Sequence, residues 1–246
     1  MKKVIIVQAR MNSTRLPGKV LMGIVGKPML VRQIERLKHC TMADEIVIAT
    51  TTNQADDPLV DIARQEGVGW FRGDEHDVLS RYVGAARYSQ ADVIVRVTAD
   101  CPLIDPQIND RIIGELLACA SQCDYASNVL QRTYPRGLDV EAFFLDTLLR
   151  MDRLARSQVA REHVTLFLRS ERPELFLRHS VVDKQNNADL RWTVDSEADL
   201  QTVRLIYQGL DLGTKIVPYP EVLSYVRARP ELTQINRDVE TWDPLQ

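Results

Sequence analysis

The chain has 246 residues, of which 45% are hydrophobic and 26% charged, and its formal net charge is −3. This length suits one large α/β domain with a sizeable buried core. The near-neutral charge argues against a generally basic surface, so we expect neither a nucleic-acid partner nor a membrane partner.

The N-terminal apolar run at residues 4–7 is too short for a signal peptide, and no run approaches the length of a membrane span. The four cysteines form no C-x-x-C pair. An α/β chain of this size needs no disulfide, so we expect free thiols in a reducing, cytoplasmic setting.

The first 120 residues alternate between expected strands and expected helices. β-branched apolar runs predict strands at residues 3–7, 45–50, 68–71 and 92–98. Helical spacing, capping residues and helix-opening prolines predict helices at residues 28–39, 57–66, 77–86 and 106–120. This alternation predicts a mainly parallel sheet with helices on both faces.

The second half is less regular. We expect strands at residues 124–127, 137–144, 175–182 and 190–194, and helices at 145–170 (in two pieces), 195–207 and 219–228. No Gly/Ser linker divides the chain, so residues 1–246 are predicted to form one domain with an extension at about residues 128–185. The alternating strand at residues 175–182 is an edge that needs covering, which favours a homodimer built on this extension.

The loop after the first strand concentrates positive charge. Residues 8–19 read QARMNSTRLPGK and contain Arg10, Arg15 and Lys19 together with Ser13. Like charges repel, and a polyphosphate bound at the carboxyl end of a strand would explain why they gather there. A solvated basic loop is the alternative. The loop matches neither G-x-x-x-x-G-K-[ST] nor G-x-G-x-x-G.

Two aspartates follow later strands. Asp100 comes just after the strand at residues 92–98, where a carboxylate can hold Mg²⁺ together with substrate phosphates. It can equally cap the turn before Pro102. Asp195 follows the expected strand at residues 190–194, and a plain helix N-cap at Asp195 or Ser196 accounts for it locally.

A polar cluster follows the second strand and includes Thr50, Thr51 and Asn53, which could hydrogen-bond a base edge or form an ordinary turn. Arg81 could also contact a base. Arg136 is a candidate for a two-pronged contact with a substrate carboxylate. A neighbouring acid such as Glu141 could pair with it instead.

The motif Q-A-R-x-x-S-x-R-L-P-G-K at residues 8–19 resembles the signature that opens the sugar-acid cytidylyltransferases, which activate KDO and sialic-type acids with CTP. The SpsF group of spore-coat polysaccharide proteins is the closest match. Residues 98–104 resemble the family's G-D-x-P-L-I segment. Residues 195–200 resemble its second metal aspartate, and residues 77–82 and 161–165 resemble runs of the SpsF group.

The resemblance implies a Rossmann-like, GT-A-like nucleotide-diphospho-sugar transferase fold. This fold is a three-layer α/β sandwich whose mainly parallel sheet carries a small antiparallel extension. It implies transfer of CMP from CTP to a KDO-type or nonulosonic acid, with release of pyrophosphate, for surface polysaccharide or glycan biosynthesis. Such enzymes commonly pair through an extension, which again favours a homodimer.

The resemblance also assigns roles. Arg10 and Lys19 would be catalytic, Asp100 and Asp195 would hold Mg²⁺, and Glu197 and Asp199 would be surface or supporting residues. The nucleotide would contact Ala9, Arg10, Ser13, Arg15, Lys19, Thr50, Thr51, Asn53, Arg81 and Asp100. The acid would contact Asn128, Arg136 and Glu141.

Two other functions remain open at this point. A glycosyltransferase that uses a pre-formed nucleotide sugar could share the fold, although such enzymes usually carry Asp-x-Asp where this chain has Thr98-Ala99-Asp100. A non-catalytic nucleotide-binding subunit could also keep it. His163 lies in an expected helix, where a lone histidine is more often structural than catalytic.

Overall fold

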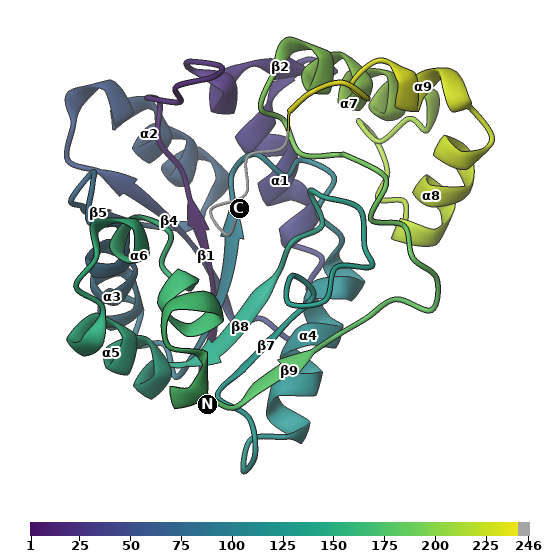
Figure 1. Ribbon diagram of the computed structural model, residues 1–246. Coiled ribbons are helices and arrows are strands. Elements are labelled where there is room, and N and C mark those ends of the chain that lie inside the picture. The colour runs from purple at the N-terminus through teal and green to yellow at the C-terminus, as the bar shows by residue number, and fades with distance from the viewer. Residues whose placement is uncertain (241–246) are drawn as a thin grey trace.

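The computed structural model describes residues 1–240, in which a seven-stranded sheet lies between two layers of helices (Figure 1). The strand order is β5-β4-β1-β6-β8-β7-β9, and β8 runs antiparallel to both of its neighbours. Its strands are β1 (Lys3–Gln8), β4 (Glu45–Thr51), β5 (Gly69–Gly73), β6 (Val93–Thr98), β7 (Tyr125–Ser127), β8 (Glu141–Phe144) and β9 (Arg178–Ser180).

Helices connect these strands, and a small hairpin, β2 (Gly23–Ile24) with β3 (Lys27–Pro28), precedes the first of them. The helices are α1 (Met29–Leu37), α2 (Asp57–Glu66), α3 (Val78–Tyr88), α4 (Pro106–Ala118), α5 (Leu145–Leu154), α6 (Gln158–Glu162), α7 (Glu197–Gly209), α8 (Tyr219–Arg227) and α9 (Pro230–Gln234). Short 3₁₀ or π turns cover Lys19–Leu21, Gln54–Asp56, Phe167–Glu171 and Pro173–Leu175.

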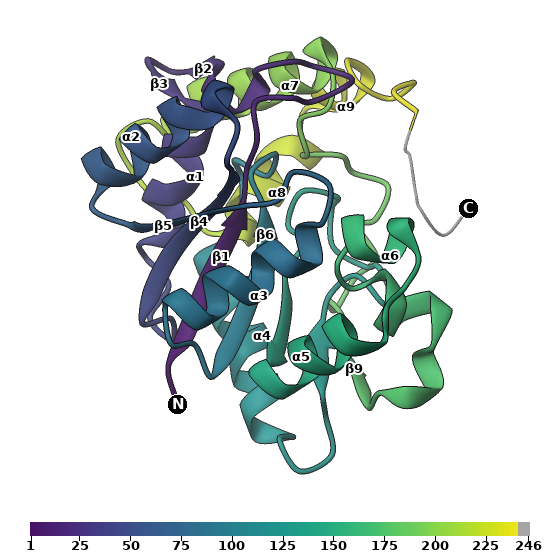
Figure 2. The same cartoon turned by 90° about the vertical axis from the view of Figure 1, so that its left-hand side faces the viewer.

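Side-chain alternation along the central strands divides the core into two layers. In β1, Ile5 and Val7 belong to the cluster packed against α1, α2, α4, α7 and α8. Val4 and Ile6 belong to the cluster packed against α3, α5 and α6. Figure 2 shows α3 and α5 in front of the strands on this second side. The predicted three-layer α/β sandwich with a mainly parallel sheet and an antiparallel part is confirmed.

Three predicted strands were wrong in whole or in part, and one of them, predicted at residues 137–144, covers only Glu141–Phe144. Residues 190–194 bend at Thr193 and form only an isolated bridge between Arg136 and Arg191, because their backbone bonds go to two different loops rather than to one strand. The strand predicted at residues 175–182 shrinks to Arg178–Ser180, because a 3₁₀ turn takes up Pro173–Leu175. The hairpin of β2 and β3 was not predicted.

Residues 128–185, which were predicted to form an extension, contribute β8 and β9 to the central sheet, and α5 and α6 to one of its faces. None of the helices within residues 1–240 combines the length and apolar character needed to cross a membrane. The four cysteines carry free thiols.

Candidate functional site

The cation-rich loop after β1 folds back on its own backbone. The carbonyl of Met11 accepts hydrogen bonds from the amides of Ser13 and Gly18, both at 2.9 Å. Gly18 has φ 72°, a left-handed conformation that glycine adopts without steric cost, and it leads into the 3₁₀ turn that begins at Lys19. The amide of Met11 donates to Asp56 Oδ1 at 2.7 Å, which ties this loop to the loop after β4.

The loop borders a cavity of about 710 Å³ at the carboxyl ends of β1 and β6. Open α/β sheets bind their ligands at this edge. Seven of the residues predicted to bind nucleotide or metal line it, namely Ala9, Arg10, Ser13, Arg15, Lys19, Asp100 and Asp195. Other lining residues come from β6, α3, α6 and the C-terminal segment, so the wall is built from distant parts of the chain.

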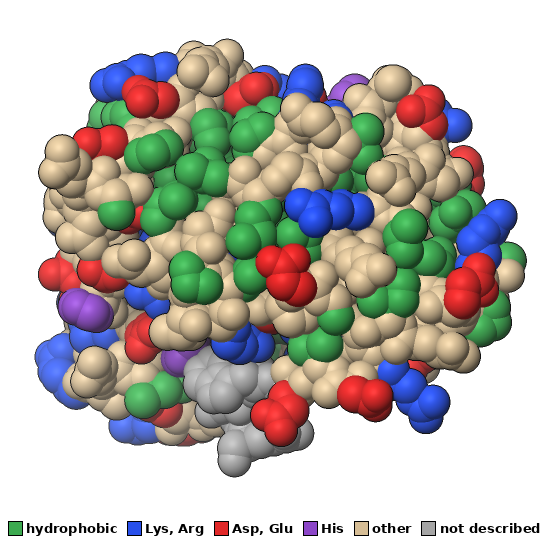
Figure 3. All heavy atoms as spheres, turned by 90° about the horizontal axis from the view of Figure 1, so that it is seen from above, with side chains coloured by type: hydrophobic (Ala, Val, Ile, Leu, Met, Phe, Trp, Pro, Cys, Tyr) green, Lys and Arg blue, Asp and Glu red, His purple; other side chains and the backbone are tan. Residues whose placement is uncertain are grey.

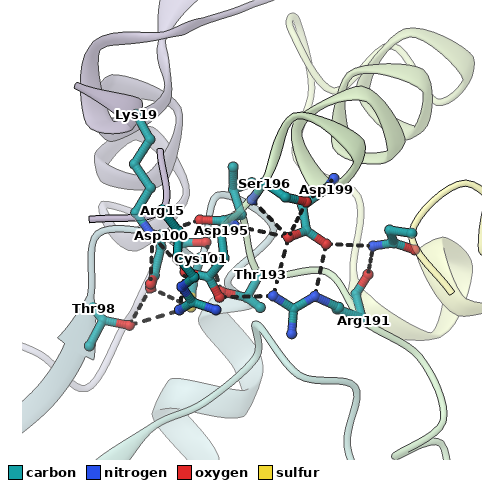
Figure 4. A network of polar contacts seen from close by, with 12 residues as sticks. Arg15, Lys19, Thr98, Asp100, Cys101, Arg191, Thr193, Asp195, Ser196 and Asp199 are labelled. Atoms are coloured by element: carbon teal, nitrogen blue, oxygen red, sulfur yellow. Dashed lines mark hydrogen bonds and ion pairs between the residues drawn. The ribbon is translucent and has the colours of Figure 1, made fainter. Parts of the chain in front are cut away.

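Lys19 joins the two aspartates (Figure 4). Its ammonium Nζ donates to Asp100 Oδ2 at 3.1 Å and to Asp195 Oδ1 at 2.8 Å. Arg15 Nη2 lies 2.8 Å from the same oxygen of Asp195. Asp100 Oδ1 is held from the other side by the hydroxyl of Thr98 at 2.5 Å. Two carboxylates that are distant in sequence therefore converge on the Lys19 ammonium.

The charges in this cluster stabilise one another. Burial opposes the charged form of Asp100, but the Lys19 ammonium and the Thr98 hydroxyl outweigh it and lower the pKa of this carboxyl to about 2. Burial likewise opposes the charged form of Lys19, whose pKa is nonetheless raised because Asp100 and Asp195 face it. Lys19 and Asp100 are thus ionised across the physiological pH range.

Backbone contacts bring the two aspartate segments together. The carbonyl of Asp100 accepts a hydrogen bond from the amide of Val194 at 2.8 Å. Gly137 permits the approach of the loop that supports residues 190–194: it has φ 105°, and a Cβ at this position would lie 2.5 Å from the amide nitrogen of Thr193. No other residue type fits so close to a neighbouring backbone.

The sequence analysis did not identify Arg191 and Asn236, two of the residues that hold Asp195 or its partners. Arg191 Nη2 donates to Asp195 Oδ2 at 2.8 Å, and Arg191 in turn is bound to Asp199. Asp199 is fully buried, whereas Glu197 is exposed. Burial would raise the pKa of Asp199, but hydrogen bonds from Arg191 and Asn236 lower it below the usual range. Asp199 therefore supports Asp195, which was one of the two roles considered for it.

The opposite wall comes from α6 and the turn that follows it. Arg10 Nη2 lies 3.7 Å from Glu162 Oε1, and both Glu162 and His163 line the cavity. Burial lowers the pKa of His163, which favours its neutral form. The lone histidine assumed to be structural therefore borders the candidate site. The sequence signal was the 161–165 run that resembles the SpsF group.

The predicted base contacts after β4 lie beside the loop but do not line the cavity. The hydroxyl of Thr51 donates to Asp56. Asn53 donates to Glu75 Oε2 at 2.5 Å, and Asn12 donates to Glu75 Oε1 at 3.2 Å. Glu75, which the sequence did not single out, thus connects the β4 loop to the cation-rich loop.

Arg81 and Thr50 are buried next to this region. The side chain of Arg81 is 1% exposed and bonds to the carbonyl of Asp74 through Nη1 at 2.5 Å. Within residues 1–240, its Nε and Nη2 and the hydroxyl of Thr50 have no hydrogen-bond partner. Buried donors of this kind usually have one, so these atoms are available to a ligand.

The three predicted acid contacts lie outside the cavity. Asn128 donates to the carbonyl of Leu138 at 2.7 Å and accepts from the amide of Val140 at 2.9 Å, so its amide holds a loop. Glu141 is buried against Arg96 and the hydroxyl of Tyr125. Arg136 lines a separate cavity of about 370 Å³. Their substrate roles remain predictions.

The site combines three cations that can bind an anion, Arg10, Arg15 and Lys19, with the carboxylates of Asp100 and Asp195.

Figure 3 looks down on the face that carries the strand-end loops, where charged side chains of both signs are scattered among hydrophobic ones. In the described part of the chain, no cluster of three or more His, Cys, Asp or Glu side chains could hold a metal ion by itself. A cation at Asp100 and Asp195 would need ligands from a bound substrate.

A family model described as cytidylyltransferase matches residues 4–214. The spore coat polysaccharide biosynthesis protein SpsF of Bacillus subtilis is 31% identical over 210 residues, covering 82% of this chain and 85% of that protein. The 3-deoxy-manno-octulosonate cytidylyltransferase of Chloroherpeton thalassium is 36% identical over 115 residues, covering 46% of this chain and 45% of that protein.

Among solved structures, a cytidylyltransferase from Leptospira borgpetersenii superposes with a TM-score of 0.90 at 31% identity. The match covers 99% of this chain and 100% of that one. The similarity therefore extends over both halves of the fold, including the extension at residues 128–185.

Proposed function

This chain belongs to the cytidylyltransferase family and is a nucleotidyltransferase, and from this premise we propose that it transfers CMP from CTP to a sugar acid of the KDO or nonulosonic type. The anomeric hydroxyl oxygen of the acid forms a bond to the α-phosphorus of CTP, the bond to the bridging oxygen breaks, and pyrophosphate leaves. The hydroxyl proton passes to solvent. The relative named as a 3-deoxy-manno-octulosonate cytidylyltransferase supports the choice of acid.

The family assignment also decides between the alternatives open at the sequence level. A glycosyltransferase would consume a nucleotide sugar. A non-catalytic subunit would not need cations and carboxylates placed together at one cavity. The family model covers most of the chain, and the cations and both aspartates meet at one cavity, which supports a nucleotidyltransferase. The name of the SpsF relative supports a role in surface polysaccharide or glycan biosynthesis. The free thiols fit the cytoplasmic setting that belongs to this proposal.

The single observation that carries the proposal is the convergence of Arg15 and Lys19 with Asp100 and Asp195 at one end of the cavity. With CTP bound, the two cations and Arg10 would turn to the triphosphate and neutralise charge that grows on the departing pyrophosphate. Catalysis of this kind consists of positioning and electrostatic stabilisation, so no protein nucleophile is required.

Asp100 and Asp195 fit Mg²⁺, because Mg²⁺ in proteins is usually held by one or two carboxylates together with substrate phosphates. When bound, Mg²⁺ would polarise the phosphate oxygens and neutralise their charge. Lys19 currently lies between the two carboxylates at 3.1 and 2.8 Å, and its ammonium would move to the phosphates as the nucleotide enters.

We propose that Arg81, Thr50, Thr51 and Asn53 form the base end of the nucleotide site. Two donors of Arg81 and the hydroxyl of Thr50 have no partner among residues 1–240, which supports this, since a cytosine offers acceptors that would satisfy them. Thr51 and Asn53 would act by shaping this loop through Asp56 and Glu75.

The sugar acid would be held by residues outside the larger cavity. Arg136 would bind its carboxylate if the smaller cavity joins the larger one in the loaded enzyme. Asn128 and Glu141 would act through the loops that they hold. A homodimer built on residues 128–185 completes the proposal, and it is supported by the four exposed large apolar side chains of this segment, Leu154, Val159, Leu175 and Leu177.

The proposal is tested by measuring pyrophosphate release from each of the four ribonucleoside triphosphates with a panel of sugar acids. We expect release with CTP that depends on the acid. Release with no acid present, or with every triphosphate alike, would contradict the assignment.

A further inference from the structure

We propose that Arg191, Asp199 and Asn236 form a buried support that fixes the orientation of the Asp195 side chain. These three are positioning residues and do not touch the nucleotide themselves. The inference rests on the role proposed above for Asp195 as a carboxylate that holds the divalent cation. It extends the site to the C-terminal segment, beyond the residues that the family model matches.

The two oxygens of Asp195 face different groups. Oδ1 lies 2.8 Å from both Lys19 Nζ and Arg15 Nη2, on the side of the cavity. Oδ2 accepts a hydrogen bond from Arg191 Nη2 at 2.8 Å, on the opposite side (Figure 4). The contact with Arg191 therefore leaves one oxygen directed to the cavity and prevents the carboxylate from turning away.

Arg191 is itself held by Asp199. Arg191 Nε donates to Asp199 Oδ1 at 2.8 Å, and Nη2 reaches Oδ2 at 3.2 Å, a two-pronged pair that fixes the guanidinium plane. Asp199 Oδ2 also accepts the amides of Asp195 and Ser196, both at 3.0 Å. One buried carboxylate thus fixes the backbone of Asp195 and the arginine that holds its side chain.

Asn236 closes the support from the C-terminal side. Its Nδ2 donates to Asp199 Oδ1 at 2.8 Å and to the carbonyl of Arg191 at 3.0 Å. The residue is 4% exposed and follows α9 in the sequence. The Asn236 amide restrains both Asp199 and the backbone of Arg191. The C-terminal segment can therefore influence Asp195 through these two residues, without contacting it directly.

Residues that hydrogen-bond a metal-binding carboxylate, without binding the metal themselves, orient that carboxylate. Removing such a partner typically weakens metal binding or activity 10- to 100-fold. Arg191→Lys keeps the charge but cannot reach Asp195 and Asp199 together, because an ammonium lacks the guanidinium fork. Asn236→Ala removes both restraints while leaving the Arg191–Asp199 pair in place, so we expect a smaller effect, about threefold to tenfold.

The test measures Mn²⁺ binding to the enzyme with CTP present and no acid, by the water-proton relaxation of Mn²⁺ immobilised on the protein. It is paired with thermal melting and with the Mn²⁺ dependence of pyrophosphate release. We expect Arg191→Lys to raise the Kd for Mn²⁺ about tenfold or more, and Asn236→Ala to raise it less. In both variants the fold decrease in kcat should exceed the fold increase in the KM for CTP. The cations proposed to bind the triphosphate, Arg10, Arg15 and Lys19, are unchanged in these variants.

Asn187→Ala is the matched control. Asn187 is also 4% exposed, and its side chain bonds to the hydroxyl of Tyr219 at 3.1 Å, away from Asp195. Both alanine variants should melt at a lower temperature, but only Asn236→Ala should change Mn²⁺ binding. Asn236→Asp places a second carboxylate beside Asp199 and serves if the alanine variant does not fold.

The Asp195→Asn variant separates a failure of the proposed support from a failure of the proposed metal role of Asp195. If Asp195→Asn weakens Mn²⁺ binding while Arg191→Lys and Asn236→Ala leave it unchanged, the support is purely structural and this inference is overturned. If Asp195→Asn itself leaves Mn²⁺ binding unchanged, the proposed metal role of Asp195 fails, and this inference falls with it.

Discussion

Lys19 Nζ lies 2.8 Å from Asp195 Oδ1, although 176 positions of sequence separate the two residues. The same ammonium reaches Asp100, so in the absence of nucleotide it pairs with both carboxylates at once. A divalent cation would have to replace this ammonium, and the phosphates of CTP offer the place to which Lys19 can move. Metal binding and nucleotide binding should therefore be coupled.

Arg10→Ala and Lys19→Ala should each remove most turnover while the protein stays folded. A preorganised cation lost from such a site typically reduces the rate ~10²–10³-fold. Lys38→Ala is a suitable control, because Lys38 pairs with Glu66 on the surface. Turnover within threefold of the wild type in both site variants, measured by pyrophosphate release, would exclude the assignment of these cations.

Lys19→Ala should also bind Mn²⁺ without nucleotide more tightly than the wild type does. With the ammonium gone, Asp100 and Asp195 face each other without their shared cation, and a divalent ion can take its place. Direct Mn²⁺ titration measures this. Equal affinity in the two proteins would mean that Lys19 does not occupy the cation position.

Asp100→Asn and Asp195→Asn should both fold, both require much more Mg²⁺ and both lose turnover, since an amide keeps the shape of the carboxylate but not its charge. The double variant should be little worse than the poorer single one, as for groups that act as a unit. Ser196, rather than Asp195, is the N-cap of α7, so capping does not explain Asp195. A normal Mg²⁺ curve for Asp195→Asn would contradict the proposed metal role of Asp195.

The local motifs were predictable because each lies in one short stretch of chain. Residues 8–19 combine a strand end, a turn and three cations, and Asp100 follows a β-branched strand, so chemistry could be assigned before any contact was known. The parallel half of the sheet was predictable for the same reason, since apolar periodicity reports burial directly.

The supporting residues were not predictable, because their roles exist only through tertiary contacts. Asn236 has no local feature that distinguishes it from a surface asparagine, and Asp199 resembles an ordinary first-turn acid until Arg191 packs against it. The strand predicted at residues 190–194 failed for a related reason. Its pattern suits a strand, but its amides bond to the carbonyls of Arg136 and Asp100 in separate loops.

Stability at low pH should depend on Asp100. Its pKa lies at about 2 in the folded protein, below the ordinary value of 3.8. A lowered folded-state pKa stabilises the fold above pH 4, and this contribution is lost as the pH falls towards 2. The free energy of unfolding of Asp100→Asn should therefore change less between pH 4 and pH 2 than that of the wild type. Asp61→Asn, on the exposed surface of α2, should follow the wild type.

Gly137→Ala should destabilise the protein and disturb the site. The new Cβ would lie 2.5 Å from the backbone of Trp192 and Thr193, and φ 105° disfavours any side chain. Gly67→Ala is the matched control, since Gly67 has φ 66° but nothing within 4 Å of the added carbon. Gly67→Ala should cost about 1 kcal/mol of unfolding free energy, and Gly137→Ala should cost more. Equal losses in urea titrations would mean that the loop simply moves aside.

The homodimer predicts a specific sensitivity to surface charge. Leu177 is 58% exposed in the extension, and Leu177→Glu would place a charge in the proposed interface. Light scattering at micromolar concentration should show a dimer for the wild type and a monomer for this variant. Val25→Glu, at an exposed valine outside the extension, should remain dimeric. A monomeric wild type would refute the proposal.

We propose that CTP and a sugar acid become a CMP-linked acid and pyrophosphate at the cavity lined by Lys19, Asp100 and Asp195. Phosphorus NMR of the enzyme with CTP, Mg²⁺ and KDO or a nonulosonic acid follows all the phosphorus at once. We expect a new phosphodiester signal and pyrophosphate to grow in equal amounts, and neither to grow with Lys19→Ala. CTP that stays intact with every acid, or that yields CDP or phosphate instead, would contradict the account.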